Sequence, residues 1–359
     1  MDTQLTSRVR DSKQVVLAAC AFETPSRIPR IEHFWDLGPE WRERLGDYDE
    51  ISDVLIRDPD ETFFPSRTRI IEEKGGYIHR LDGWGRLTRT RPGSYFSETI
   101  DVALPAGKDP DSLRFDPPDL DIRFCIEGLP PAESLRKIEE EKTRFCVFGK
   151  TGGPFLRSAF LRGEEQFLVD ISRDPSLASA IAKRVADHLT AVGVEEIRRW
   201  NLHETGIWIY DDIGTSQGPI VSPRSFERIF LPLYRRMIEA YRRAGARYVF
   251  LHSDGNVIPL LDMFVDAGID GLNPVERHSG MDPAVIRARY PRLVLAGGVD
   301  NIGTLHDGPV EKIVEETRTL IEMGRSGGVI IGAHSIGPDI PLEHYLAYHD
   351  TILKYGRFR

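Results

Sequence analysis

Two side chains that can bind a metal ion, His252 and Asp254, follow directly after the apolar run at residues 248–251. Aromatic and β-branched residues that end in Asp-Gly-Asn are typical of a buried strand that stops at a tight turn. Because side chains two residues apart point to the same side of a strand, we expect the imidazole and the carboxylate to face the same way. The alternative is a strand-end histidine followed by an aspartate that only forms the turn.

A second imidazole, His334, follows the last apolar run of the chain, at residues 328–333. Two imidazoles and one carboxylate can hold Zn²⁺ with an open fourth position, or a non-haem Fe²⁺. We therefore predict a site for zinc or another divalent metal on His252, Asp254 and His334. Without a metal, Asp254 could instead act as a general acid or orient a substrate hydroxyl group.

The elements that would position these residues are apolar strands that alternate with helices along the C-terminal two-thirds of the chain. The expected strands cover residues 144–148, 206–211, 247–252, 269–273, 293–298 and 328–333. Two earlier strands, near residues 31–35 and 61–64, bring the total to eight, which predicts an α/β fold of the TIM (β/α)8 barrel type. The alternative is an open doubly wound sheet, but no Gly-x-Gly-x-x-Gly motif follows the first strand to support a dinucleotide site.

The N-terminal third departs from this regular alternation. A helical segment is expected at residues 11–22, and the polar residues 38–60 are also expected to be helical. Residues 75–118 are rich in Gly and Pro and include alternating apolar and polar positions, which predicts β-hairpins inserted into the barrel. We expect residues 1–359 to form a single domain that carries this β-rich insertion.

The active site of a TIM barrel lies at the C-terminal ends of its strands. Acids, imidazoles, amides and aromatic residues follow the expected strands here, and no nucleophile elbow, phosphate-binding loop or Cys-x-x-Cys motif is among them. Catalytic roles are expected for Asp211, Asp212, His252 and Asp254. Substrate-binding roles are expected for His33, Trp35, Trp84, Tyr210, Asn273 and Glu276.

Composition excludes several classes of protein. The net charge of −9 argues against nucleic acid or an anionic membrane as a partner. The three cysteines have no metal-like spacing and are expected to be reduced core residues of a cytoplasmic protein. The polar N-terminus has no leader-like apolar segment, and no stretch reaches the ~18 apolar residues of a membrane helix.

Several ordered stretches between roughly residues 140 and 355 resemble the uroporphyrinogen decarboxylase (URO-D) superfamily, and within it the cobalamin-dependent methyltransferases. The matching stretches are residues 210–214, 218–223, 251–256, 268–275, 297–300 and 327–341. The resemblance implies a TIM barrel, a homodimer, and a corrinoid supplied by a separate partner protein. Thiol-activating members of that group bind zinc through His-x-Cys and a later Cys. Here Asp254 stands at the first cysteine position and His334 near the second, so softer thiolates are replaced by harder ligands.

The N-terminal third distinguishes the chain from the decarboxylases themselves. Those enzymes carry an early Arg-Gln-Ala-Gly-Arg stretch that binds substrate carboxylates, whereas residues 32–38 here lack it. Residues 82–85, Asp-Gly-Trp-Gly, resemble the O-demethylase methyltransferases instead. Trp84, Tyr95 and Phe96 could then wall an aromatic substrate, or they could form the small core of the insertion.

The expected function is transfer of a methyl group from a methoxylated or methylated small molecule to a corrinoid protein, helped by an acid or a metal. An aryl or alkyl oxide is a poor leaving group, which is why such help is needed. A decarboxylase or lyase that acts on a small acid without metal, through Asp254 or Asp211, is the alternative. A non-catalytic ligand-binding barrel is the third possibility, and the crowding of ionisable groups at one barrel face weighs against it.

Overall fold

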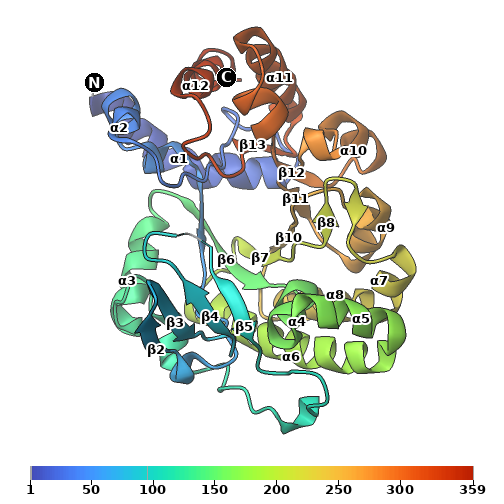
Figure 1. Ribbon diagram of the computed structural model, residues 1–359. Helices are drawn as coiled ribbons and strands as arrows, with labels where there is room; N and C mark the ends of the chain where they lie inside the picture. The colour runs from blue at the N-terminus through green and yellow to red at the C-terminus, as the bar shows by residue number, and fades with distance from the viewer. Residues whose placement is uncertain (1, 95, 359) are drawn as a thin grey trace.

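A computed structural model describes residues 2–94 and 96–358. Within these residues, seven parallel strands form one curved sheet around the centre of the molecule, with helices outside it (Figure 1). In spatial order they are β1 (Val54–Arg57), β6 (Cys146–Gly152), β7 (Gly206–Tyr210), β10 (Tyr248–His252), β11 (Gly271–Asn273), β12 (Val294–Val299) and β13 (Val329–Ala333). The α/β barrel expected from the sequence is confirmed, and the strands expected from residue 144 onward lie within two residues of their observed starts.

The gap between β13 and β1 is filled by an irregular segment, residues 29–34. Ile31 N donates to Ile331 O at 2.9 Å, and on the opposite side Asp53 N donates to Arg30 O at 2.9 Å. The strand expected near residues 31–35 is thus present only as isolated parallel bridges at Arg30 and Phe34. Hydrogen bonds from both neighbours nevertheless let this segment close the sheet into a barrel.

The predictions of a strand at residues 61–64 and of a helix at residues 38–60 were wrong. Residues 38–60 contain α2 (Pro39–Leu45), a short 3₁₀ turn (Tyr48–Ile51) and then β1. Phe63 and Phe64 are buried as part of a loop, because Phe63 packs on Phe115 with ring centroids 4.5 Å apart. Their hydrophobicity therefore serves an aromatic cluster and not a strand.

Helices cover the outside of the barrel and the end at which its strands begin. They are α1 (Asp2–Cys20), α3 (Pro131–Glu141), α4 (Pro154–Arg162), α5 (Glu164–Arg173), α6 (Pro175–Arg199), α7 (Pro223–Ile229), α8 (Leu231–Arg243), α9 (Ile258–Ala267), α10 (Pro283–Arg289), α11 (Val310–Met323) and α12 (Leu342–Tyr355). Helices α7 and α8 are separated at Phe230, because Pro232 cannot donate a backbone hydrogen bond at that break. Among the described residues, no helix is both long and apolar enough to cross a membrane.

The barrel interior is filled by alternate side chains of the strands. The rings of Trp208 and Phe250 stack with centroids 4.7 Å apart, and Phe148 meets both of them edge-on. Val16 and Ala19 of α1 join this cluster, and Ala19 O accepts a hydrogen bond from Gly328 N just before β13. Helix α1 therefore covers the N-terminal ends of the strands, and the opposite end is left for chemistry.

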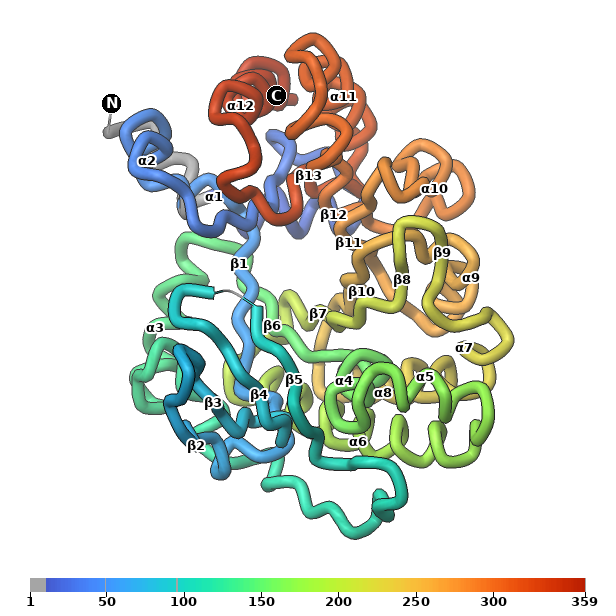
Figure 2. Tube along the Cα trace, in the orientation of Figure 1, coloured from blue at the N-terminus to red at the C-terminus, as the bar shows by residue number. Residues whose placement is uncertain are grey.

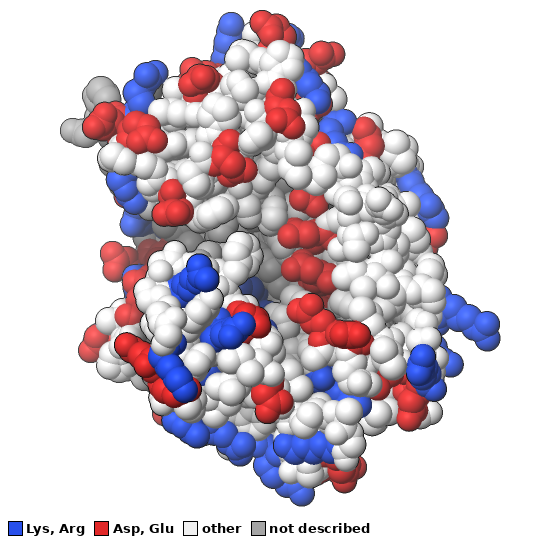
Figure 3. All heavy atoms as spheres, viewed as in Figure 1, with Lys and Arg blue, Asp and Glu red and all other residues white. Residues whose placement is uncertain are grey.

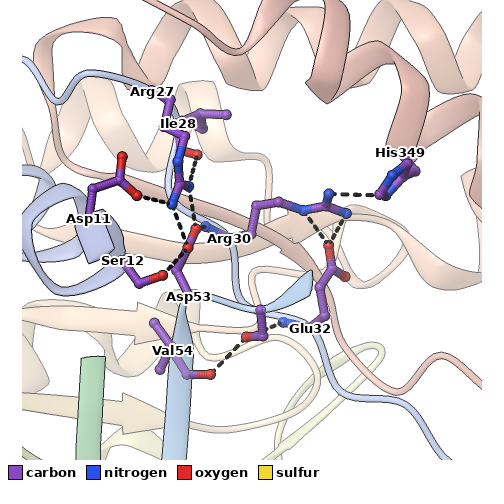
Figure 4. Close-up of polar contacts among 10 residues, drawn as sticks. Asp11, Ser12, Arg27, Ile28, Arg30, Glu32, Asp53, Val54 and His349 are labelled. Carbon is purple, nitrogen blue, oxygen red and sulfur yellow. Dashed lines mark hydrogen bonds and ion pairs between the residues drawn. The ribbon is translucent and has the colours of Figure 1, made fainter. Parts of the chain in front are cut away.

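Buried charges fix the closing segment in place (Figure 4). Asp53 accepts two hydrogen bonds from Arg27, at 2.6 and 2.7 Å, and one from Ser12 at 2.7 Å. Arg30 pairs with Glu32 at 2.7 Å, and both side chains are almost fully buried. These contacts join α1, β1 and the segment that leads to the barrel mouth.

The C-terminal end of the chain packs against the same closing segment. Arg30 also donates to Tyr345 of α12 at 3.2 Å, and Tyr348 donates to Glu32 at 2.8 Å. Ile28 N donates to Gly356 O at 2.8 Å, so residues from the two ends of the chain lie side by side (Figure 2). The barrel is thus closed by contacts between the two ends of the sequence.

The β-rich insertion expected at residues 75–118 is present, and its sheet begins earlier, at Arg69. Its antiparallel strands are β2 (Arg69–Lys74), β3 (Tyr77–Leu81), β4 (Leu87–Thr90) and β5 (Glu98–Asp101). The turn between β3 and β4 attaches this sheet to the barrel, since Phe64 N donates to Gly83 O at 2.7 Å and Trp84 packs on Phe63 at 5.1 Å. The insertion is therefore anchored at one end by aromatic packing.

His188 of α6 supports this anchor and makes it sensitive to pH. Its Nε2 lies 3.1 Å from Glu61 O, and its ring meets the stacked rings of Phe63 and Phe115 edge-on, with centroids 5.5 and 5.4 Å away. Burial, followed by the charge of Arg123, lowers the pKa of His188 to about 4. The neutral imidazole is consequently the form that the folded protein holds.

We expect His188 to reduce stability as the pH falls from about 6.5 towards 4, because the unfolded chain takes up a proton that the folded chain does not. Between pH 7 and 5 this amounts to about 2 kcal/mol. His188→Gln keeps a donor for Glu61 O and removes the titration. Urea unfolding should therefore show that the free energy of unfolding falls less between pH 7 and pH 5 for the variant than for the wild type. An equal fall in both proteins would contradict the assignment.

Candidate functional site

Three side chains meet at the C-terminal end of the barrel. His252 ends β10, Asp254 lies two residues further on, and His334 directly follows β13. Asp254 Oδ1 lies 3.5 Å from His252 Nε2 and 3.4 Å from His334 Nε2, and one ligand atom from each residue lies within 4.8 Å of the other two. The structure thus brings together the three residues that the sequence singled out.

His252 is held in one orientation by the next strand of the barrel. Asn273 Nδ2 donates to Ala296 O at 2.9 Å, which turns Asn273 Oδ1 towards His252 Nδ1. The proton of the imidazole therefore lies on Nδ1, and the lone pair of Nε2 faces Asp254. Burial, with a contribution from His334, lowers the pKa of His252 to about 4, so the ring is neutral near pH 7.

Asp254 is the unusual member of the group. Its Oδ1 atom is buried, and among the described residues nothing donates a hydrogen bond to it. Burial, then the charges of Asp212 and Glu276, raise the pKa of Asp254 to about 7. A carboxyl group in this position can exchange a proton near neutral pH, and its ionised form would be stabilised by a cation.

His334 completes the group from the opposite part of the sheet. Burial lowers the pKa of His334, so its imidazole is also neutral near pH 7. Its Nε2 lies 3.2 Å from Ser335 Oγ, which is the hydroxyl of a residue in the left-handed backbone region, with φ of 56°. The two histidines therefore present uncharged nitrogen atoms to one carboxylate oxygen.

This donor set fits a divalent metal ion. Zinc bonds of about 2.0–2.1 Å in a tetrahedral site place neighbouring ligand atoms roughly 3.3 Å apart. The two measured nitrogen–oxygen separations, 3.5 and 3.4 Å, are close to that value and longer than ordinary hydrogen bonds. The unpartnered oxygen of Asp254 and the lone pair of His252 are what a bound cation would satisfy.

The two aspartates that follow β7 differ in role. Asp212 Oδ1 accepts from Asp254 N at 3.1 Å and lies 3.9 Å from His252 Nε2, so Asp212 faces the group. Asp211 is fully buried on the outer side of the sheet, where its carboxylate accepts from Phe155 N and Leu156 N at 2.9 and 2.6 Å. Tyr234 also donates to Asp211. These contacts give Asp211 a structural role at the start of α4, and the catalytic role expected for it stays a prediction.

Tyr210 and Lys150 form the adjoining wall of the mouth. The Tyr210 ring stacks on His252 with centroids 4.0 Å apart and planes inclined by 16°. Lys150 Nζ lies 4.8 Å from the centre of the same ring and 3.4 Å from Asp58 Oδ2. Sequence analysis missed Lys150, although its place at the end of β6 was a sufficient signal.

The other expected substrate-binding residues are spread more widely. His33 lies beside the mouth, because Ile336 N, two residues after His334, donates to His33 O at 2.7 Å. Burial, then the charges of His334 and Lys150, lowers the pKa of His33. Trp35 is exposed and lies close to Gly337. Asn273 holds His252 through its Oδ1 atom, and its expected contact with substrate stays a prediction. Glu276 Oε2 accepts from Gly255 N at 2.7 Å and thereby fixes the turn after Asp254.

Trp84 lies in the aromatic anchor of the insertion. Its ring packs on Phe160 at 5.6 Å, and Arg157 lies 4.7 Å above it. Phe96 is 81% exposed, and Tyr95 lies outside the described residues. The contacts of Trp84 therefore match the packing role that the sequence left open beside the substrate-binding one.

Two further residues at this end of the barrel were not among the expected site residues. His278 Nδ1 lies 2.9 Å from Asp300 Oδ1, and these residues follow β11 and β12. Their position after two predicted strands was a signal that could have found them.

In the space-filling view, acidic side chains line one wall of a hollow at the centre of the molecule (Figure 3).

Comparison with solved structures gives a match along nearly the whole chain. A methyltransferase from Methanosarcina mazei superposes with a TM-score of 0.63 over 96% of this chain and 98% of the other, at 16% sequence identity. At that identity, the match establishes a shared fold.

Comparison with curated sequences points to the same superfamily. The uroporphyrinogen decarboxylase of Syntrophotalea carbinolica is 24% identical over 273 residues, which are 74% of this chain and 73% of the relative. The enzyme of the same name from Geobacter metallireducens is 23% identical over 260 residues, 70% of each chain. The family model described as uroporphyrinogen decarboxylase (URO-D) matches residues 117–355, which is more than half of the chain. The chain therefore belongs to the uroporphyrinogen decarboxylase family.

Proposed function

We propose that this chain is a methyltransferase that takes a methyl group from a small methoxylated or methylated molecule and passes it to a corrinoid carried by a separate protein. The observation that carries the proposal is the group of His252, Asp254 and His334 at the barrel mouth, with a carboxylate oxygen that lacks a hydrogen-bond partner. Membership of the URO-D family and the fold shared with a methyltransferase support it.

A divalent metal such as zinc would be held by these three residues. When bound, it would act as a Lewis acid towards the oxygen or nitrogen atom that the methyl group leaves. His252 and His334 are suited to this role because both are neutral near pH 7. The harder ligand set, without a thiolate, suits a donor whose leaving atom is not sulfur.

The protein's own residues would prepare the substrate. Tyr210, stacked on His252, would form part of the wall beside an aromatic or methylated group of the substrate. Asp212 and Glu276 flank Asp254 and are placed to accept hydrogen bonds from substrate hydroxyl or amine groups. Because acidic groups gather here and Lys150 is already paired with Asp58, a substrate with many carboxylates would be repelled.

A metal-free decarboxylase or lyase is the second candidate. The pKa of Asp254, about 7, is near the value that a general acid needs at neutral pH, and the curated relatives are named decarboxylases. The two candidates differ in their products and in their need for metal. Release of carbon dioxide that survives a strong chelator would favour the second. A homodimer, expected by resemblance, stays a prediction.

The direct test uses protein loaded with one equivalent of zinc, free cobalamin reduced to the cob(I)alamin state, and a panel of methoxylated aromatic donors. We expect methylation of the cobalamin, followed by absorbance, and loss of that activity after chelation. Asp254→Asn should lower the bound zinc from about one equivalent to near zero and reduce transfer by about 10²–10⁴-fold, with an unchanged circular dichroism spectrum.

Asp266→Asn is the matched control, because Asp266 is an exposed aspartate on α9. It should bind zinc and transfer methyl groups as the wild type does. Asp254→Cys should bind zinc more tightly than the wild type, since thiolate is the softer ligand that zinc accepts well. Full zinc binding and full methyl transfer by Asp254→Asn would show that Asp254 is neither a metal ligand nor a catalytic residue.

Asn273 provides a second test of the proposed metal site. Asn273→Leu removes the acceptor that holds the Nδ1 proton of His252, so we expect zinc affinity to fall about 10–100-fold. Asn273→Asp keeps an acceptor and should retain most of the affinity. Competition with a chromophoric chelator measures both variants, and equal affinities for Asn273→Leu and the wild type would contradict the positioning role.

A further inference from the structure

His278 and Asp300 form a pair beside the metal ligands that the proposed function does not use. His278 belongs to the short turn Arg277–Ser279 after β11, and Asp300 follows β12 at the start of the turn Asn301–His306. Both strand ends open onto the barrel mouth. The pair therefore lies at the same end of the barrel as His252, Asp254 and His334.

Asp300 is a rigid partner for this histidine. Its Oδ1 atom accepts hydrogen bonds from Ile302 N at 3.0 Å and Gly303 N at 3.1 Å, and the residue is only 4% exposed. His278 Nδ1 lies 2.9 Å from the same oxygen. A buried carboxylate that accepts from backbone amides remains an acceptor, so the Nδ1 atom of His278 carries a proton.

The other nitrogen of His278 faces the site. Nε2 lies 4.0 Å from Glu276 Oε1, while Glu276 Oε2 is held by Gly255 N at 2.7 Å. The charge of His278 also acts on Asp254, where it opposes the rise in the pKa of that carboxyl group. A separation of 4.0 Å is too long for a hydrogen bond and leaves Nε2 available to a third group.

Carboxylates surround the imidazole of His278. Asp300 lies at one nitrogen, Glu276 near the other, and Asp254 is within electrostatic reach. The imidazole has a carboxylate on each side, and the side chain is still partly open to solvent. A histidine oriented by a buried carboxylate, with its free nitrogen towards a substrate, is a recurring arrangement for proton transfer.

We propose that His278 is the catalytic acid that protonates the leaving group, and that Asp300 is its positioning residue. The inference rests on the proposed methyl transfer. As the bond between the methyl carbon and the donor oxygen breaks, the methyl group goes to the corrinoid acceptor. The oxygen takes the proton from His278 Nε2, which leaves a neutral imidazole and an alcohol or phenol as the product. Substrates with strongly basic leaving groups, such as alkyl or electron-rich aryl methyl ethers, are the class that needs this proton most.

The test compares His278→Gln with His306→Gln. His306 Nδ1 also lies 2.6 Å from an aspartate oxygen, Asp307 Oδ1, but His306 is exposed at the end of the turn that follows Asp300. Each zinc-loaded variant is assayed with cob(I)alamin and two donors, 4-methoxytoluene and 4-nitroanisole. We expect His278→Gln to lose about 10²–10³-fold in transfer from 4-methoxytoluene and less than about tenfold from 4-nitroanisole, whose leaving group needs little protonation. His306→Gln should match the wild type with both donors.

Two other measurements separate a catalytic acid from a structural residue. Zinc affinity of His278→Gln should stay within about threefold of the wild type, because His278 is not a ligand. In protein labelled with ¹⁵N-histidine, the signal lost in His278→Gln should carry a proton on Nδ1 and should shift in Asp300→Asn.

Each outcome bears on the inference separately from the proposed function. Equal transfer from 4-methoxytoluene by His278→Gln and the wild type overturns the inference alone. The same loss with both donors, or a signal unaffected by Asp300→Asn, also overturns it. Absence of transfer by the wild type from every donor overturns the proposed function, and the inference with it.

Discussion

A barrel of this size, made of seven strands and one closing segment, has an interior just wide enough for its own side chains, and that limit decides where chemistry can take place in this protein. Alternate residues of each strand point inwards, and Phe148, Trp208 and Phe250 fill the middle of the barrel by direct ring contact. The next inward-pointing position of each strand lies two residues closer to its C-terminal end, and polar side chains can be accommodated there. Lys150, Tyr210 and His252 occupy those positions.

The same limit explains the electrostatic character of the mouth. Side chains in this last inward layer are partly buried, so each pays for lost contact with water unless a partner compensates. His252 and His334 respond by remaining neutral, and Asp254 by holding its proton more tightly than an exposed aspartate would. A bound cation would relieve this burial cost for the carboxylate and use both nitrogen lone pairs. The proposed metal site and the raised pKa of Asp254 are therefore two consequences of one packing arrangement.

Much of this could be predicted from the sequence, because the signals were local. The apolar runs of the later strands and the spacing of His252 and Asp254 follow from the two-residue period of a strand. The same period puts Asp211 on the opposite side of the strand from Tyr210 and Asp212, which the catalytic role expected for Asp211 did not take into account. What could not be predicted depends on distant contacts. The closing segment is defined by its hydrogen bonds to Ile331 and Asp53, and the role of Asn273 by which of its side-chain atoms faces His252.

The divalent metal proposed on His252, Asp254 and His334 would take the place of the zinc–thiolate sites of the thiol-activating methyltransferases. The most direct test is a crystal structure of the zinc-loaded protein, with anomalous scattering data collected on both sides of the zinc absorption edge. The account predicts one strong anomalous peak at about 2.0–2.2 Å from His252 Nε2, Asp254 Oδ1 and His334 Nε2. A mouth without a peak at saturating zinc, or a peak held by other side chains, would contradict it.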